Sequence, residues 1–344
     1  MPNQYPPIDI LENSLRRRGR ILDILLTDRT RTTERKTHNI IWATDSYTYL
    51  WHKKCCKNPY CPEAEIQHDQ ITGMNGNLIQ PRAAKSREEQ RARTKDKAEV
   101  FTPLSVVKQM NNDIMHSLNL PKDHTWRDFI AARWLEIACG EAPFIASRYN
   151  PVANTQKIIK PENRVGFLDE KLKLVNKYCD SKDEWLANAE IALKACYGYE
   201  WQGDSLLIAR ENILMTMNDF YKIKFESDPN IESQAAKDGG LTTEQLEHFA
   251  EIASWNIFQM DGLRYVIPMT CKNTTPQKQR RASNTLFDMS KVPVAVGKSE
   301  QLQLKIEQCP GCRTNNPTKH NGVYVKIMDW HSNKTIKFYK LAQS

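Results

Sequence analysis

Apolar positions follow two different spacings from about residue 100 onward. Stretches in which apolar residues recur every three or four positions predict amphipathic helices, and four occur, at 104–118, 182–196, 206–217 and 242–253. Short continuous apolar runs predict buried strands, and these lie at 133–138, 196–200 and 255–260. Strands that alternate with helices along a chain imply a parallel sheet with crossover helices.

Local signals mark the ends of these elements. A polar N-cap residue, followed by proline at the first turn or by Glu or Gln three residues later, predicts the start of a helix. Three pairs fit this pattern: Thr102 with Pro103, Ser181 with Glu184, and Thr242 with Gln245. Near the C-terminus, the apolar segments VYVKIM and TIKFYKL flank HSNK, which predicts a β-hairpin within 323–341.

The composition is that of a protein with a sizeable core. The chain has 344 residues, of which 40% are hydrophobic and 26% charged, and this balance excludes wholesale disorder, a collagen and a membrane channel. No apolar run approaches the roughly 18 residues that a membrane span needs, and the first residues lack a signal peptide's apolar segment. The nine unevenly spaced cysteines therefore indicate reduced thiols in a cytoplasmic protein with no membrane partner.

Three regions differ in character. Residues 1–97 form a basic N-terminal region, 98–270 carry the alternating pattern, and 271–344 begin with a polar, basic, loop-like segment and end in the hairpin. The N-terminal region holds two cationic runs. They consist of Arg16, Arg17, Arg18, Arg20, Arg29, Arg31, Arg35 and Lys36, and of Arg82, Lys85, Arg87, Arg91, Arg93, Lys95 and Lys97. Such runs are either solvated faces or tracks for nucleic-acid phosphates, which the net charge of +8 permits.

Candidate ligand-binding residues follow two of the predicted strands. Glu136 lies in the first predicted strand, 133–138, which runs into the small-residue turn Ala138-Cys139-Gly140, and Glu200 ends the second. A turn of small residues lets a ligand approach free backbone N–H groups. An acid at the end of the next strand can accept hydrogen bonds from a ribose hydroxyl pair. Such a turn can also serve packing alone.

Together with Phe101-Thr102-Pro103, these segments resemble the adenine-specific DNA methyltransferases of restriction–modification systems. Their FTP segment, their acidic-P-A-C-G-x-G-x-F segment and their strand ending in an acid occur in this order. The matching residues are Phe101, Thr102, Pro103, Glu136, Ala138, Cys139, Gly140, Phe144 and Glu200. Asp261, in WNIFQMDGL, resembles the acid of the next family segment. The leading segments ILDILLTDRT and NIIWATDSY also look like those of the M subunits of such systems.

This resemblance implies an α/β, Rossmann-like fold that binds S-adenosyl-L-methionine. Thr102 and the turn 138–142 would hold the methionine part, Glu200 the ribose and Asp261 the adenine amine. Asp169 is a rival for the ribose, although a solvent-exposed helix cap explains it better. The implied activity is methylation of adenine in double-stranded DNA, with Cys139 part of the turn and not a nucleophile. A chain of this length leaves little room for target recognition, so a separate specificity or restriction subunit is expected.

The chain departs from the family pattern at the turn and in the catalytic segment. Ile137 replaces the usual proline and Ala142 the second glycine, and no [D/N]-P-P-[Y/F/W] segment follows Asp261. Two partial matches, Asn58-Pro59-Tyr60 and Asn316-Pro317-Thr318, are better explained as turns. The catalytic residues therefore remain unassigned. A second hypothesis is a methyltransferase-fold subunit that binds DNA or regulates a restriction system without catalysis.

Two further patterns suggest metal chemistry. Asp169-Glu170-Lys171 faintly resembles the carboxylate and lysine cluster of a magnesium-dependent nuclease, a triplet that chance also produces. Cys309-Pro-Gly-Cys312 offers two thiolates with zinc-knuckle spacing, or else forms a turn with free thiols. The other two ligands would come from Cys55, Cys56, Cys61, His52 or His68. Because their partnership with Cys309 and Cys312 does not follow from spacing, the sequence alone assigns no metal ligand.

Overall fold

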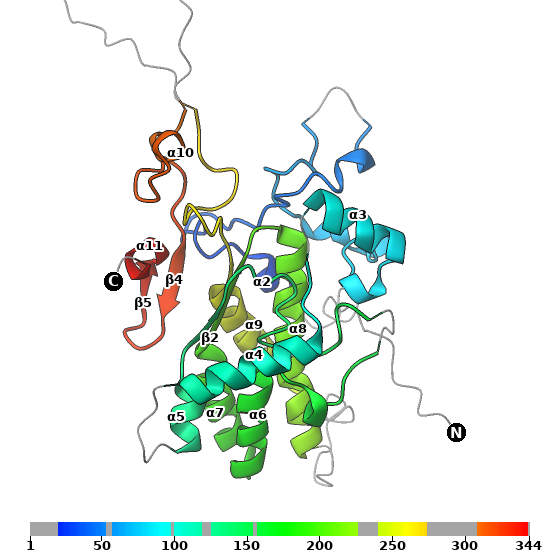
Figure 1. Ribbon diagram of the computed structural model, residues 1–344, viewed down its shortest axis with the longest axis vertical. Helices are drawn as coiled ribbons and strands as arrows, with labels where there is room; N and C mark the ends of the chain where they lie inside the picture. Colours follow the sequence, from blue (N-terminus) through cyan, green and yellow to red (C-terminus); the bar gives the residue numbers. More distant parts are fainter. Residues whose placement is uncertain are drawn as a thin grey trace, which may run out of the picture.

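The computed structural model of this chain has a mixed α/β architecture (Figure 1). It describes residues 20–52, 57–97, 100–118, 125–153, 157–225, 240–273 and 308–342. The helices in these ranges are α2 Ile21–Leu26, α3 Arg87–Lys97, α4 Leu104–Ser117, α5 Trp126–Ala131, α6 Phe167–Tyr178, α7 Lys182–Lys194, α8 Gly203–Phe225, α9 Thr243–Asn256, α10 Pro310–Thr314 and α11 Phe338–Leu341. The strands are β1 Trp134–Glu136, β2 Cys196–Glu200, β3 Ile257–Gln259, β4 Lys326–Asp329 and β5 Lys334–Lys337.

A three-stranded parallel sheet lies at the centre of the fold. Its strand order is β1-β2-β3, with Glu136 opposite Gly198 and Glu200 opposite Gln259. The three strands predicted from the apolar runs are therefore confirmed, and so is their parallel pairing. The prediction placed the start of the third strand too early, because α9 continues through Asn256. The larger Rossmann-like methyltransferase fold stays a prediction.

The two faces of the sheet are covered by different parts of the chain. Along β2, the buried Cys196 and Gly198 alternate with the partly buried Tyr197 and Tyr199. Helices α6 to α9 pack on one another, and α7, α8 and α9 contact β2 or β3. Tyr197 and Tyr199 pack in a second cluster that includes Phe338 and the hairpin β4–β5. This hairpin was predicted from the sequence, and its attachment to the sheet explains the aromatic positions in β2.

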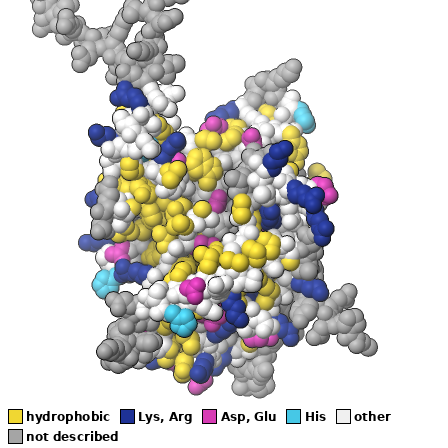
Figure 2. All heavy atoms as spheres, viewed as in Figure 1, with side chains coloured by type: hydrophobic (Ala, Val, Ile, Leu, Met, Phe, Trp, Pro, Cys, Tyr) yellow, Lys and Arg dark blue, Asp and Glu magenta, His cyan; other side chains and the backbone are white. Residues whose placement is uncertain are grey.

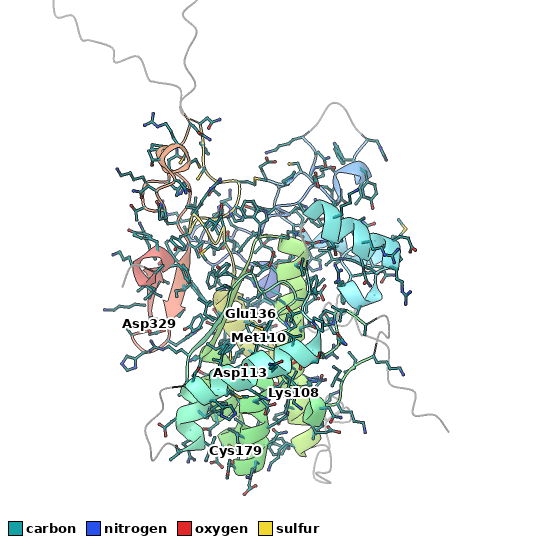
Figure 3. The ribbon with its side chains drawn as sticks, viewed as in Figure 1. Lys108, Met110, Asp113, Glu136, Cys179 and Asp329 are labelled. Atoms are coloured by element: carbon teal, nitrogen blue, oxygen red, sulfur yellow. The ribbon has the colours of Figure 1, made fainter. Side chains whose placement is uncertain are left out.

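Most of the predicted helices form where their periodicity placed them. The side chains of Leu206, Leu207, Ala209, Ile213, Leu214 and Met217 in α8 are fully buried. Ser181 accepts a hydrogen bond from the Glu184 amide at 3.2 Å, and Thr242 forms the predicted capping box. Helix α4 differs from the prediction. Pro103 takes its N-cap position instead of Thr102, and Met110 is 45% exposed because the helix lies on the surface (Figures 1 and 3).

The described N-terminal segment is packed into the same core as the sheet. Helix α2 contacts α9, and Ile40 and Trp42 are completely buried. The side-chain amide of Gln259 pairs with the backbone of Ile41, accepting from its N–H at 2.9 Å and donating to its carbonyl at 2.8 Å. A Cβ at Gly203 would stand 2.1 Å from the Ile41 carbonyl oxygen, so glycine allows α8 to begin against this segment.

One buried arginine ties this arrangement together. The guanidinium of Arg210 in α8 donates to the carbonyls of Ile257 and Ser254 at 2.7 and 3.0 Å and also to those of Leu25 and Thr27. Burial lowers its pKa from 12.5 to about 9, which leaves it protonated at neutral pH. Among the described helices none combines the length and the apolar character needed to cross a membrane.

Candidate cofactor site

The candidate site begins where β1 ends. Glu136 closes this strand, and its two carboxylate oxygens accept the amides of Phe144 at 3.4 Å and Ile145 at 3.1 Å. The carboxylate thereby folds the following turn back onto the strand. Burial raises the pKa of Glu136 well above its usual value, since a carboxylate is more costly to bury than a carboxylic acid. Glu136 lies near the centre of the molecule and holds the chain after the turn through these two hydrogen bonds (Figure 3).

The turn itself has an unusual backbone. Ala138, Gly140 and Ala142 all have positive φ, of 49°, 54° and 58°. Glycine adopts this region freely, whereas each alanine costs on the order of 1 kcal/mol. The second glycine of the family pattern would therefore suit position 142, and Ala142 holds the conformation while fully buried. Left-handed residues that alternate with ordinary ones turn successive N–H groups inward, an arrangement that binds anions in other proteins.

Glu200 links the end of β2 to this turn. Its Oε2 accepts the Gly140 N–H at 2.9 Å, and its Oε1 accepts the Gln202 N–H at 3.1 Å. The carboxylate is nearly buried, and burial raises its pKa even though these amides oppose the shift. A carboxylate has about four acceptor positions, so Glu200 can take a further donor. The two segments singled out from the sequence thus meet through a direct hydrogen bond.

Phe101 of the FTP segment also lies against the turn. A Cβ on Gly140 would stand 3.3 Å from Cε1 of the Phe101 ring, so the ring and the glycine are in close approach. The guanidinium of Arg82 lies 5.0 Å from the centre of the same ring, at a distance suited to a cation–π contact. Thr102 is partly buried beside Phe101, and Pro103 is exposed. The structure therefore brings the three predicted segments to one end of the sheet.

Glu141 lies in the predicted turn 138–142, but the sequence assigned no separate role to its side chain. Its Oε1 accepts the Arg82 amide at 2.7 Å, and its Oε2 accepts the Tyr149 hydroxyl at 2.7 Å. Asn212 of α8 donates to both the Glu141 carbonyl, at 3.2 Å, and the Tyr149 oxygen, at 2.8 Å. A charged residue in a turn of small residues was the available signal. Its partners Arg82 and Asn212 are 59 and 71 positions away, which no local pattern reveals.

Asp261 lies two residues beyond β3, at the same end of the sheet. Its Oδ1 accepts the amides of Leu263 at 3.0 Å and Arg264 at 3.2 Å, and its Oδ2 is 3.4 Å from the Arg264 guanidinium. The side chain thus caps its own turn. The amide of Met260 donates to the Glu200 carbonyl at 3.0 Å, which holds this segment beside β2.

Two other candidates take structural positions. Cys139 is buried, and burial raises its pKa well above 9, so the thiol stays protonated and is a poor nucleophile. Asp169 is also buried, and its Oδ2 accepts the amides of Ser147 and Gly166, both at 2.8 Å. The helix cap proposed for Asp169 is confirmed, although its predicted exposure was wrong. Lys171 is buried too and donates to the Ala132 carbonyl at 2.6 Å, which argues against the nuclease triplet.

The two cationic runs differ in their surroundings. In the first run, Arg29 and Arg31 form ion pairs with Glu251 at 3.3 Å and with Asp28, whereas Arg16 to Arg18 lie outside the described residues. In the second run, Arg93 pairs with the buried Asp204 at 2.7 Å. Four members line a cavity of about 540 Å³ beside α3, namely Arg82, Arg87, Arg91 and Lys95. Lys and Arg side chains gather over this helix in Figure 2.

The Cys309–Cys312 pair lies far from the turn, in the C-terminal part of the chain. The structure brings it together with Cys271 and His320 and not with the N-terminal candidates. His68 instead contacts Asp23 at 2.7 Å, and Cys55 and Cys56 lie outside the described residues. Most of the basic segment 271–283 lies outside them as well.

Comparisons of the chain with protein-family models, with curated proteins and with solved structures found no match.

Proposed function

We propose that this protein is an S-adenosyl-L-methionine-dependent methyltransferase that acts on adenine in DNA. The observation that carries the proposal is the hydrogen bond from the Gly140 amide to the Glu200 carboxylate. It sets a left-handed turn of small residues beside a strand-end acid at the carboxyl ends of parallel strands. Ligands of open α/β sheets bind at this edge.

The donor set at this edge fits the proposed cofactor. Glu200 offers a carboxylate to the ribose hydroxyls, and the 138–142 turn offers close backbone approach because Ala138 is exposed and Gly140 lacks a side chain. Phe101 and the Arg82 guanidinium border the turn on the side of Gly140. When bound, the cofactor would supply a methyl group on a positively charged sulfur.

The direction of approach of DNA is suggested by α3. Arg87, Arg91 and Lys95 are spaced four residues apart, so they project from one face of this helix, and all three are exposed. The same face borders Arg82, which contacts the turn. Cations in this arrangement neutralise phosphates and release counterions. A target base has to leave the helical stack to reach the cofactor, at a cost of a few kcal/mol.

A catalytically inactive subunit is the second candidate. It is favoured by the lack of a [D/N]-P-P-[Y/F/W] segment after Asp261, since that segment positions the target amine in the resembling family. Within the described sheet, β1 is an edge strand. Leu135 in this strand and Ile137 directly after it are 42% and 68% exposed. An edge strand flanked by exposed apolar side chains is suited to pairing with another chain.

Methyl transfer from radiolabelled S-adenosyl-L-methionine to unmodified double-stranded DNA tests the proposal. Cofactor binding to the same preparation is measured separately by calorimetry. Label in the DNA supports the enzyme. Cofactor binding without label supports the inactive subunit or the need for a partner. Absence of both contradicts the assignment of the turn and of Glu200.

A further inference from the structure

The structure assigns a zinc site to Cys271, Cys309, Cys312 and His320. One potential ligand atom from each residue lies within 4.8 Å of those of the other three. Within the described part of the chain, these four residues form the cluster of His, Cys, Asp or Glu side chains that could hold a metal ion. Three thiolates and one imidazole form a common ligand set of structural zinc. The site is independent of the proposed methyltransferase function.

The distances within the cluster match a single tetrahedral ion. The sulfur atoms of Cys271, Cys309 and Cys312 lie 3.5, 3.6 and 3.6 Å from Nδ1 of His320. With zinc–sulfur and zinc–nitrogen bonds of about 2.3 and 2.0 Å, the sulfur–nitrogen edge of a tetrahedron is about 3.5 Å. A ring nitrogen carries one proton or one lone pair, so it cannot form hydrogen bonds to all three sulfurs at once. A shared ion accounts for three nearly equal sulfur–nitrogen distances.

Two glycines allow the chain segments around the cluster to approach one another closely. Gly311 stands between the two cysteines of the CxxC segment, and a Cβ there would come within 2.6 Å of both the His320 ring and its amide nitrogen. A Cβ on Gly322 would stand 3.1 Å from the Cys271 sulfur. The two glycines therefore leave the space in which the three ligand-bearing segments meet.

Hydrogen bonds outside the four ligands hold these segments in register. The Asn321 amide donates to the Cys309 sulfur at 3.3 Å, an interaction that stabilises a thiolate. The Asn321 side chain bonds reciprocally to the backbone of Lys272, at 3.0 and 2.7 Å. The Val323 amide donates to Thr270 Oγ1 at 3.0 Å. The chain next to Cys271 is thereby fixed to the chain next to His320.

The site has a structural and not a catalytic design. All four coordination positions are supplied by the protein, whereas catalytic zinc keeps one position open for water or substrate. The ion would fasten the segment that follows β3 to α10, which lie beside each other in Figure 1. It would thereby anchor the start of the C-terminal region, whose hairpin covers the Tyr199 face of the sheet.

The metal content of the purified full-length chain tests this assignment. Elemental analysis of protein prepared without chelator is expected to give one zinc per chain. The variants Cys271→Ser and Cys312→Ser are each expected to lose that zinc. Cys61→Ser is the matched control, because Cys61 is the described cysteine that the sequence offered as an alternative ligand, and its zinc content is expected to be unchanged.

Cobalt substitution identifies the ligands. Co²⁺ in the wild-type site is expected to show the visible bands of a tetrahedral ion with three thiolates and one imidazole. His320→Cys is expected to retain the metal and to shift these bands toward a four-thiolate pattern, which keeps the test informative if a serine variant fails to fold. Substoichiometric zinc after reconstitution, iron in its place, or full retention in both Cys271→Ser and Cys312→Ser would overturn the assignment.

Discussion

The amide of Gly140 donates a hydrogen bond to Oε2 of Glu200 over 2.9 Å, between residues that lie 60 positions apart. This bond closes the turn after β1 against the end of β2. Because the Glu200 carboxylate can still accept another donor, one side chain can both shape the turn and contact a ligand. Because Glu200 would serve both purposes, we expect its substitution to affect ligand binding strongly.

Two substitutions test this edge of the sheet as a cofactor site. Glu200→Ala and Gly140→Asp are each expected to weaken binding of S-adenosyl-L-methionine more than tenfold, or by at least about 1.4 kcal/mol. The first removes the proposed ribose acceptor, and the second places a side chain at φ +54° against the Phe101 ring. Calorimetric titration measures the effect. Glu170→Ala serves as the acidic control, because Glu170 of α6 pairs with Lys173 at 2.8 Å. Unchanged affinity in both test variants would refute the site.

The buried acid at the end of β1 predicts a pH dependence of stability. Burial raises the pKa of Glu136 in the folded protein, whereas the unfolded chain has the ordinary value of about 4.3. The folded state then binds more protons, so its stability falls as pH rises from about 4.3 through the folded pKa. The slope contributed by one group reaches at most about 1.4 kcal/mol per pH unit.

Glu136→Gln removes this titration. The free energy of unfolding is measured in urea at several values between about pH 5 and 8. The difference between the variant and the wild type is expected to shift in favour of the variant as pH rises. The amide also loses one acceptor for the Phe144 or Ile145 N–H, which lowers its stability at every pH. If the free energies of unfolding of the two proteins changed in parallel with pH, the raised pKa of Glu136 would be contradicted.

The strained turn predicts a stabilising substitution. Ala138 has φ 49° and is exposed, so Ala138→Gly removes strain without losing buried surface. We expect the free energy of unfolding to rise by about 0.5–1 kcal/mol. Ala187→Gly, at an exposed position inside α7, is the matched control and is expected to lower stability by a similar amount. A loss of stability in both variants would show that position 138 is not strained.

The cationic face of α3 predicts how DNA binding responds to salt. Replacing Arg87, Arg91 and Lys95 together by alanine is expected to reduce affinity for double-stranded DNA. It should also lower the magnitude of the slope of log K against log salt by up to about 3, since each phosphate contact contributes about 0.9. Fluorescence anisotropy over a salt series measures both effects.

A charge-matched control separates this face from net charge. Arg127, Lys177 and Lys182 lie on α5, α6 and α7, at the other end of the molecule (Figure 1). Their joint replacement changes the net charge by the same amount and is expected to leave the slope nearly unchanged. Equal losses of DNA affinity in the two triple variants would mean that DNA does not bind specifically at α3.

How much could be predicted from the sequence depended on how local each signal was. The three strands were predicted, at 133–138, 196–200 and 255–260, because a short apolar run between helices can be recognised without the tertiary structure. Their observed bounds are 134–136, 196–200 and 257–259. Capping at Ser181 and Thr242 was equally local, since both partners lie within one helical turn. The CxxC segment is a local signal too, because its two cysteines are three positions apart.

The tertiary structure alone decided the contacts between distant segments. It turned Glu200 toward Gly140, paired Gln259 with Ile41 across 218 positions, and joined Cys271 and His320 to the CxxC knuckle. From the residue type one can infer that a buried polar group needs a hydrogen-bond partner. The residue type does not show which distant group is that partner. That choice follows from how the helices and the sheet pack, because packing sets which backbone amides, carbonyls and thiols come within bonding distance.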